Sequence, residues 1–157
     1  MVSVSLHVSA LDAIPPTTLY KILWLRVSVF VVEQSAAYAE LDGRDIEDGA
    51  LHVWAETEGG DVVGALRLLD EGSQWRIGRV VAAPAVRGSG IAGTLMMRAL
   101  EVAAAADPGR DVVLDAQEPL ASWYARFGFA VAGPGFVEDA IPHVPMRRSS
   151  EMSARRP

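Results

Sequence analysis

The chain has 157 residues, half of them hydrophobic, and a formal net charge of −6 at pH 7. This length and composition predict a single domain with a substantial hydrophobic core, while the acidic balance disfavours a general nucleic-acid-binding protein and favours cationic ligands. Because the sequence contains no cysteine, disulfides, thiolate metal sites and a cysteine nucleophile are excluded.

The sequence has the features of neither a signal peptide nor a membrane span. The N-terminal residues lack a basic start followed by an apolar run, and the most apolar stretch, residues 23–32, is short and interrupted by Arg26. We therefore expect a cytoplasmic protein with no membrane partner.

The first predicted elements are a strand and a helix. Apolar residues that alternate with Ser and His over residues 2–8 predict a half-buried strand. After two consecutive prolines, Thr17 or Thr18 can cap a helix that we expect to extend to about Val32. The residues expected on the inner face of this helix are Leu19, Ile22, Leu23, Arg26, Val27 and Phe30.

Residues 33–50 have no regular hydrophobic pattern and are rich in carboxylates. The acidic side chains that we single out in this segment are Glu40, Asp42, Asp45, Glu47 and Asp48. They could attract a cationic amine toward a binding site, or they could form a solvated acidic loop. Their spacing does not match a calcium-binding EF-hand loop.

The rest of the chain alternates strands, turns and helices. Predicted strands span 51–57, 62–69, 77–83, 111–116, 129–131 and 144–147, and predicted helices span 91–106 and 120–127. The resulting order, β-α-β-β-β-α-β-α-β-β, predicts an α/β fold with a mixed sheet and helices on its faces. We expect residues 1–148 to form one domain and residues 149–157 to be a disordered tail.

The loop before the predicted helix 91–106 contains Gly88, Ser89 and Gly90. Glycines at a strand-to-helix turn let backbone N–H groups approach a ligand closely, because no Cβ intervenes. The helix start adds unpaired N–H donors and the positive end of the helix dipole. Together these features predict a phosphate-binding site.

One reading assigns this phosphate to a dinucleotide. Gly88, Gly90 and Gly93 match the pattern G-x-G-x-x-G, and Asp115 follows at a strand end. Against this reading, the loop lies late in the chain, three antiparallel-looking strands precede it, and residues 84–87 separate the strand from the first glycine. A Walker-type phosphate loop is excluded because no Gly-Lys-Ser/Thr occurs.

Two further motifs favour a different ligand. In chain order they are Arg87-x-x-Gly90-x-Ala92, preceded by a strand ending in Ala-Ala-Pro, and Tyr124-x-x-x-Gly128-Phe129. On these motifs and the element order, nearly the whole chain resembles the GNAT family of acyl-CoA-dependent N-acyltransferases. Each motif alone is weak, whereas both in order with the right elements between them are specific.

Within that family, the chain is similar to the ElaA-like subgroup. The segments that carry this similarity are Arg26-x-x-Val29-Phe30-Val31-Val32-Glu33-Gln34, Tyr38, Asp42-Gly43-x-Asp45, Ile77-Gly78-Arg79-Val80 and Ile141-Pro142-His143. Ala140 is a small departure, since the subgroup usually has Gly at this position.

The resemblance implies a mixed, largely antiparallel central sheet in which the strand 80–83 splays from the strand 113–116, with helices flanking the sheet. The pantetheine of acetyl-CoA, the implied acyl donor, would enter the gap and bond to the backbone of Val81 and Ala83. One of these N–H groups would polarise the thioester carbonyl. The implied donor-binding residues are Val80, Val81, Ala82, Ala83, Arg87, Gly88, Ser89, Gly90, Ile91, Ala92 and Gly93.

The resemblance also implies direct acetyl transfer to a primary amine of a small molecule or a protein, with no metal. Tyr124 is the expected acid for the leaving thiolate, because a phenol with a reference pKa of ~10 is protonated at neutral pH. The catalytic base is left open between Glu33, Asp115 and His143, and ordered water is a further alternative. Histidine is attractive because imidazole ionises near neutral pH in model peptides.

Other functions remain as alternatives. A non-catalytic acyl-CoA-binding sensor would not need an acid at Tyr124. The end of the first helix also has a distant similarity to acyl-homoserine-lactone synthases, although the chain is shorter than those enzymes. The sequence identifies neither the acceptor amine nor the acyl length, and it leaves the oligomeric state open, with a homodimer as one option.

Overall fold

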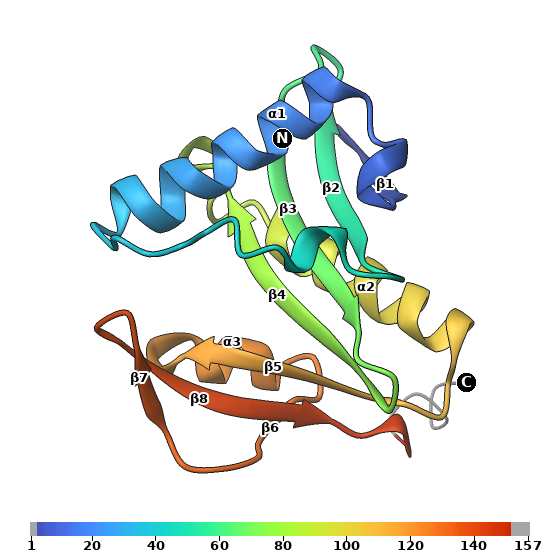
Figure 1. Ribbon diagram of the computed structural model, residues 1–157, viewed down its shortest axis with the longest axis vertical. Helices are drawn as coiled ribbons and strands as arrows, with labels where there is room; N and C mark the ends of the chain where they lie inside the picture. Colours follow the sequence, from blue (N-terminus) through green and yellow to red (C-terminus); the bar gives the residue numbers. More distant parts are fainter. Residues whose placement is uncertain (1–2, 152–157) are drawn as a thin grey trace.

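Residues 3–151, the part of the chain that the computed structural model describes, form a mixed sheet flanked by helices (Figure 1). The main elements in chain order are β1 (Val4–Ser9), α1 (Pro16–Val27), β2 (Leu51–Thr57), β3 (Val62–Asp70), β4 (Gln74–Ala82), α2 (Ile91–Ala106), β5 (Asp111–Gln117), α3 (Ala121–Ala125), β6 (Ala130–Val131), β7 (Phe136–Glu138) and β8 (Ile141–Arg148). The strand order is β1-β2-β3-β4-β5-β8-β6, and β7 pairs with β8. Among these pairs only β4 and β5 are parallel, which confirms the predicted mixed, largely antiparallel sheet.

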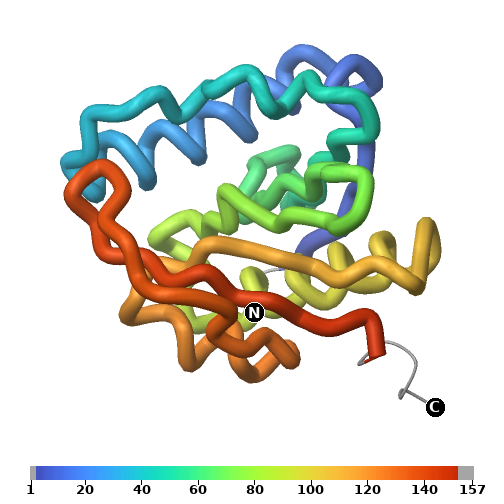
Figure 2. The backbone as a smooth tube through the Cα atoms, turned by 60° about the horizontal axis from the view of Figure 1, so that its bottom comes forward, coloured from blue at the N-terminus to red at the C-terminus, as the bar shows by residue number. Residues whose placement is uncertain are grey.

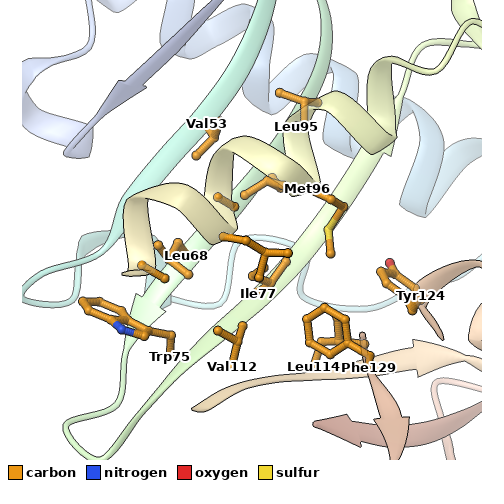
Figure 3. Close-up of a cluster of buried hydrophobic side chains, with 14 of the residues drawn as sticks. Val53, Leu68, Trp75, Ile77, Leu95, Met96, Val112, Leu114, Tyr124 and Phe129 are labelled. Carbon is orange, nitrogen blue, oxygen red and sulfur yellow. The ribbon is translucent and has the colours of Figure 1, made fainter. Parts of the chain in front are cut away.

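Helices α1 and α2 cover opposite faces of the sheet (Figure 1). On the α2 face, Leu95 and Met96 are fully buried in a cluster that includes Val53 of β2 (Figure 3). On the other face, Ile22 of α1 packs in a separate cluster with Trp54 of β2. Successive side chains of a strand point to opposite faces, so Val53 and Trp54 contribute to different layers.

The first helix differs from the prediction at both ends. It begins at Pro16, and no side chain caps it, so neither threonine has the predicted capping role. Beyond Val27 the backbone continues as a π-helix over Ser28–Glu33 rather than as an α-helix. A π-helix is a rare conformation that occurs often at functional sites. Here it ends at Glu33, whose side chain lines a cavity.

The inner face of the first helix is also only partly as predicted. Ile22 and Arg26 are buried as expected. Leu25 and Val29 are buried as well, although the predicted face omitted them, and the expected inner residue Leu23 is only partly buried.

The C-terminal third contains one strand that the sequence did not predict. Phe136–Glu138 forms β7, which pairs with β8 through a turn at Asp139 and Ala140. Both turn residues have positive φ angles, 49° and 63°, without being glycine, so the turn has no glycine signal in the sequence. The predicted helix 120–127 is shorter, with a 3₁₀ turn before Ala121–Ala125.

Strand β4 has an irregular register with β3 and separates from β5. The β3–β4 register shifts between Ala65 and Arg67, where a bulge accommodates Arg79 at φ 55°. Pairing between β4 and β5 is confined to their first residues and ends at Arg76 and Val113. Figure 1 shows the two strands diverging beyond this point, which confirms the expected splay.

Gly64 of β3 lies where α2 approaches the sheet most closely. A Cβ at this position would lie 2.9 Å from both Ile91 Cγ2 and Leu95 Cδ1. We expect Gly64→Ala to lower the free energy of unfolding by about 1–3 kcal/mol, because a packed core must shift to accept the methyl group. Denaturant unfolding checks this, with Gly59→Ala as the matched control, since its Cβ would meet only Thr57 Oγ1 at 3.9 Å. Equal midpoints for the two variants would contradict the prediction.

The chain ends are described only in part. Val2 of the predicted first strand lies outside the described residues, as do residues 152–157 of the predicted tail. Within the described part of that tail, the backbone N–H of Ser150 donates to Asp111 Oδ1 at 2.8 Å. Over residues 3–151, no helix is long and apolar enough to cross a membrane.

Candidate active site

The separation of β4 from β5 opens a cavity of about 330 Å³, called the strand cavity here. Its lining residues are Val29, Phe30, Glu33, Gln34, Tyr38, Ile77, Gly78, Arg79, Val80, Val81, Ala82, Arg87, Leu114, Asp115, Gln117, Leu120, Tyr124 and His143. The cavity therefore brings together the π-helix, the splayed strands and β8. All four predicted candidates for acid and base, Tyr124, Glu33, Asp115 and His143, lie on its wall.

A second, larger cavity of about 800 Å³, called the loop cavity, lies beside the glycine loop. Its lining residues are Val80, Val81, Ala82, Val86, Arg87, Gly88, Gly90, Ile91, Ala92, Gly93, Thr94, Met97, Leu120, Trp123, Tyr124, Arg126 and Phe127. The two cavities share six residues, among them Ala82, Arg87 and Tyr124. A ligand that binds in the loop cavity can thus extend into the strand cavity.

The start of α2 supplies hydrogen-bond donors to the loop cavity. No side chain caps this helix, and its first intrahelical bond, Thr94 N–H to Gly90 O at 3.0 Å, leaves the amides of Ile91, Ala92 and Gly93 without helical partners. The helix is 16 residues long, so its dipole adds a positive potential at this end. A phosphate group fits this environment.

The two loop glycines adopt backbone conformations that favour glycine. Gly88 and Gly90 have φ angles of 82° and 87°, and a Cβ at either position would meet no atom within 4 Å. The space in front of the loop is therefore free for a ligand, while the positive φ angles explain why glycine occurs at both positions.

Most of the predicted donor-binding residues line these cavities, but two do not. Ser89 turns its hydroxyl back to the carbonyl of Val86, and Ala83 lines a different pocket beneath α1. The remaining predicted residues that line the loop cavity are Val80, Val81, Ala82, Arg87, Gly88, Gly90, Ile91, Ala92 and Gly93.

The register between β3 and β4 shows that, contrary to the prediction, Val81 and Ala83 are not the residues whose backbone groups face the gap between β4 and β5. Ala83 N–H donates to Val63 O at 2.9 Å, so this amide is used by β3 and is not available to a ligand. Antiparallel pairing alternates, so Val81, which is opposite Ala65, also directs its backbone groups to β3. Ala82 lies between them, so its backbone N–H and carbonyl point away from β3 and into the gap between β4 and β5. There Arg87 Nε donates to the Ala82 carbonyl at 3.4 Å.

Tyr124 of α3 lies on the wall that both cavities share. Its side chain is 8% exposed and packs at the end of the core beside Leu114 and Phe129, with the hydroxyl directed away from both (Figure 3). The hydroxyl makes no hydrogen bond to another of residues 3–151, and burial raises the pKa of Tyr124 to about 12. The phenol is therefore a protonated donor that has no partner among the described residues.

Two of the three candidate bases are held in ion pairs. Glu33 accepts a bidentate pair of hydrogen bonds from Arg87, at 2.7 and 2.6 Å, which lowers the pKa of the Glu33 carboxyl. Asp115 accepts a hydrogen bond from Arg76 Nη1 at 3.2 Å. A carboxylate stabilised by an arginine is a weaker base, so Glu33 is not poised to take a proton in this state.

His143 of β8 is arranged differently. Its Nδ1 lies 2.8 Å from the carbonyl oxygen of Ile141, and a carbonyl can only accept, so Nδ1 must carry the proton. In the neutral ring this leaves Nε2 with a free lone pair. The imidazole also stacks on Phe136, with ring centroids 5.7 Å apart. Nε2 of His143 is therefore free to accept a proton, whereas the Glu33 carboxylate is held by Arg87.

The acidic segment is only partly the solvated loop that the sequence suggested, because Glu47 and Asp48 are exposed whereas Glu40 and Asp45 are buried in ion pairs. Arg26, 1% exposed, donates to Asp45 at 2.7 Å and to Glu40 at 3.1 Å, and both carboxylates are buried. Arg67 pairs with Asp42 and Asp45, and Arg79 pairs with Glu40 and Asp42. Burial alone would raise the pKa of Asp45, but the hydrogen bond and charge of Arg26 outweigh it and hold the pKa below its ordinary value.

This ion network fixes the wall of the strand cavity. Arg79, at the β4 bulge, donates to Glu40 Oε2 at 2.7 Å, and its guanidinium lies 5.5 Å from the ring centroid of Tyr38. The left-handed conformation of a non-glycine residue costs about 1 kcal/mol or more. The pairing of Arg79 with two carboxylates offsets this cost and keeps the bulge in place.

A third cavity adjoins the strand cavity beneath the β7–β8 turn. It has a volume of about 370 Å³, and its lining residues are Gln34, Tyr38, Ala39, Asp42, Arg79, Gln117, Glu138, Asp139, Ile141 and His143. Figure 2 shows the hairpin tip beside the segment that follows the first helix. Gln117 and Gln34 are hydrogen-bonded at 3.2 Å across the same gap.

Arg126 is a candidate binding residue that sequence reasoning missed. It lines the loop cavity, is exposed and has no ion pair to another described residue. Its position inside the motif Tyr124-x-x-x-Gly128-Phe129 was the available signal, because the end of α3, where this motif begins, lines the loop cavity. Over residues 3–151, no group of three or more His, Asp or Glu side chains could hold a metal ion.

Comparison with known proteins identifies the family. A family model described as an acetyltransferase (GNAT) domain matches residues 23–150. The chain belongs to the GNAT acetyltransferase family. Membership confirms the predicted GNAT fold, with its parallel β4–β5 pair and flanking helices.

Relatives confirm the similarity to the ElaA-like subgroup of GNAT proteins. A UPF0039 protein of Mycobacterium tuberculosis is 44% identical over 144 residues, which cover 88% of this chain and 89% of the relative. ElaA of Escherichia coli is 36% identical over 148 residues, covering 91% and 93%, and its crystal structure matches with a TM-score of 0.87. The crystal structure of an acyl-CoA N-acyltransferase from Pseudomonas aeruginosa matches with a TM-score of 0.88 and 39% identity, covering 94% of this chain and all of that one.

Proposed function

We propose that the protein is an N-acetyltransferase that transfers an acetyl group directly from acetyl-CoA to a primary amine of a small molecule or a protein. The observation that carries this proposal is the position of Tyr124. Its side chain is largely buried, its hydroxyl has no hydrogen-bond partner among the described residues, and it lines both the loop cavity and the strand cavity where they meet. A proton donor at this junction suits a reaction in which the acyl donor binds in the loop cavity, the acceptor binds in the strand cavity, and the leaving group is protonated between them.

The loop cavity provides a fitting site for the phosphates and pantetheine of the donor. The free amides at the start of α2 would hold the diphosphate, and Arg87 and Arg126 would add positive charge. The open edge of β4 at Ala82 would bond to the pantetheine, and a backbone N–H on this edge would polarise the carbonyl. The donor supplies its acetyl group as an activated thioester.

The strand cavity provides the proton-transfer groups. The amine nitrogen forms a bond to the acetyl carbon, and the carbon–sulfur bond breaks. His143 Nε2 accepts the proton that the amine loses, directly or through water, and Tyr124 protonates the departing sulfur. The chain has no cysteine that could form an acyl-enzyme intermediate, which agrees with direct transfer.

The role of His143 can be tested with His143→Asn. The asparagine amide can replace the Nδ1–H donor to the carbonyl of Ile141, but it has no basic nitrogen. We expect kcat to fall by about 10²-fold, the low end of the range for a general base, with unchanged binding of CoA by calorimetry. If His143→Asn keeps the kcat of the native protein, the base lies elsewhere.

The overall proposal is tested by incubating the protein with acetyl-CoA and a panel of primary amines while thiol release is followed. We expect release above the hydrolysis background with at least one amine, and a product heavier by one acetyl group in mass spectrometry. CoA binding without turnover of any amine would instead support the sensor alternative. Failure to bind CoA would contradict both.

A further inference from the structure

The ion pair between Glu33 and Arg87 spans the boundary between the two cavities. Glu33, at the end of the π-helix, lines the strand cavity only, whereas Arg87, at the start of the glycine loop, lines both cavities. Both guanidinium Nη atoms bond to the carboxylate, at 2.7 and 2.6 Å. Arg87 is the only hydrogen-bond partner of the Glu33 carboxylate among residues 3–151.

The position of Arg87 allows a second partner. It immediately precedes Gly88, and its side chain borders the cavity in which the unpaired amides of α2 lie. A guanidinium binds phosphate in the same bidentate geometry as it binds a carboxylate, and a diphosphate carries more negative charge. The side chains of Arg87 and Glu33 are 44% and 42% exposed, and a solvent-exposed pair of this kind is weak enough to exchange.

Exchange would change the strand cavity as well. Once Arg87 turns to another anion, Glu33 loses its counter-charge and stands as a free carboxylate on the wall that also contains His143. The effect of Arg87 on the carboxyl pKa, which it lowers, is then lost. A free carboxylate in this place is suited to bind an ammonium group, the form in which most primary amines exist at neutral pH.

We propose that Arg87 exchanges Glu33 for the diphosphate of the acyl donor, so that donor binding exposes the Glu33 carboxylate to the ammonium group of the acceptor. This inference rests on the proposed acetyltransferase function. It makes the acceptor an amine that arrives as a cation, and it makes binding ordered, with the donor first. In this scheme Glu33 binds and orients the ammonium group, and His143 takes one proton from it to free the lone pair for attack. The second proton, lost after the carbon–nitrogen bond forms, replaces the one that Tyr124 gives to the departing sulfur.

The test is calorimetric titration of CoA into the native protein and into Glu33→Gln. The variant removes the competitor for Arg87, so its affinity for CoA should increase by up to about fivefold, which corresponds to ~1 kcal/mol, and more at low ionic strength. The KM for the acceptor should rise in the same variant. A merely structural role of Glu33 would weaken both interactions, so the opposite signs are diagnostic.

Two further variants complete the experiment. In an Arg87→Gln background, which should bind CoA more weakly, Glu33→Gln should no longer increase the affinity. Glu101→Gln is the matched control, because it removes the same charge from an exposed pair with Arg98 on α2, away from both cavities. It should leave the affinity for CoA unchanged.

The outcomes separate the inference from the proposed function. Unchanged or weaker CoA binding by Glu33→Gln overturns the exchange. Failure of the native protein to bind CoA would overturn the proposed function itself. Equal thermal midpoints for the native protein and Glu33→Gln are expected, because the pair is exposed, and they ensure that the affinities compare folded proteins.

Discussion

Tyr124→Phe is expected to lower kcat by about 10²-fold while leaving the affinity for CoA nearly unchanged. General acids contribute roughly 10²–10⁴-fold to catalysis, and an acid with a pKa raised to about 12 by burial belongs at the low end of that range. Only the hydroxyl is removed, so the ring still packs against Leu114 and Phe129. Thiol release under saturating substrates measures the effect.

The stability of the same variant provides an internal check. The Tyr124 hydroxyl makes no hydrogen bond to another of residues 3–151, so its removal should change the free energy of unfolding by less than about 1 kcal/mol. Tyr20→Phe, at a side chain that is 72% exposed on α1, is the matched control and should have native kcat. A kcat for Tyr124→Phe within twofold of the native value would remove the assigned role.

The largest loss of stability is expected for Arg26→Met. Arg26 is 1% exposed and pairs with the buried carboxylates of Glu40 and Asp45. Removing one member of a buried ion network leaves uncompensated charge, which typically costs about 3–5 kcal/mol. Arg79 and Arg67 still contact these carboxylates, at 2.7 and 3.4 Å, so we expect a loss of about 3 kcal/mol.

Denaturant unfolding at neutral pH measures this loss. Arg98→Met is the control, because Arg98 pairs with Glu101 at 3.5 Å on the surface of α2, where both side chains are largely exposed. We expect the control to lose no more than about 1 kcal/mol. If both variants lose the same free energy, the buried network does not stabilise the fold as described.

Features that depend on local sequence were predicted well. Strand β2 has the predicted limits, Leu51–Thr57, because alternation and flanking turn residues act over a few positions. The helix Ile91–Ala106 and the open glycine loop before it were also predicted, because helix propensity and the conformational freedom of glycine are properties of the residues themselves.

Features that depend on partners distant in the chain were predicted poorly. The carboxylates of residues 33–50 suggested either a solvated loop or a site for a cation. Three of them, Glu40, Asp42 and Asp45, are instead neutralised by arginines of α1, β3 and β4. The sequence shows how many charges the segment has, but not which arginines contact them in the folded chain. The β7 strand was missed for a different, local reason, because the turn that joins it to β8 contains Asp139 and Ala140 instead of glycine.

By itself, the sequence determined the family, the order of most elements and the place of the glycine loop before α2, because motifs and periodicity depend on neighbouring residues. Only the tertiary structure decided which groups are available for chemistry. Pairing with Val63 takes the amide of Ala83 away from the gap, and Arg87, 54 positions from Glu33, occupies that carboxylate. These contacts depend on the register of strand pairing and on which distant side chains come within reach of one another. Both are set only when the chain folds.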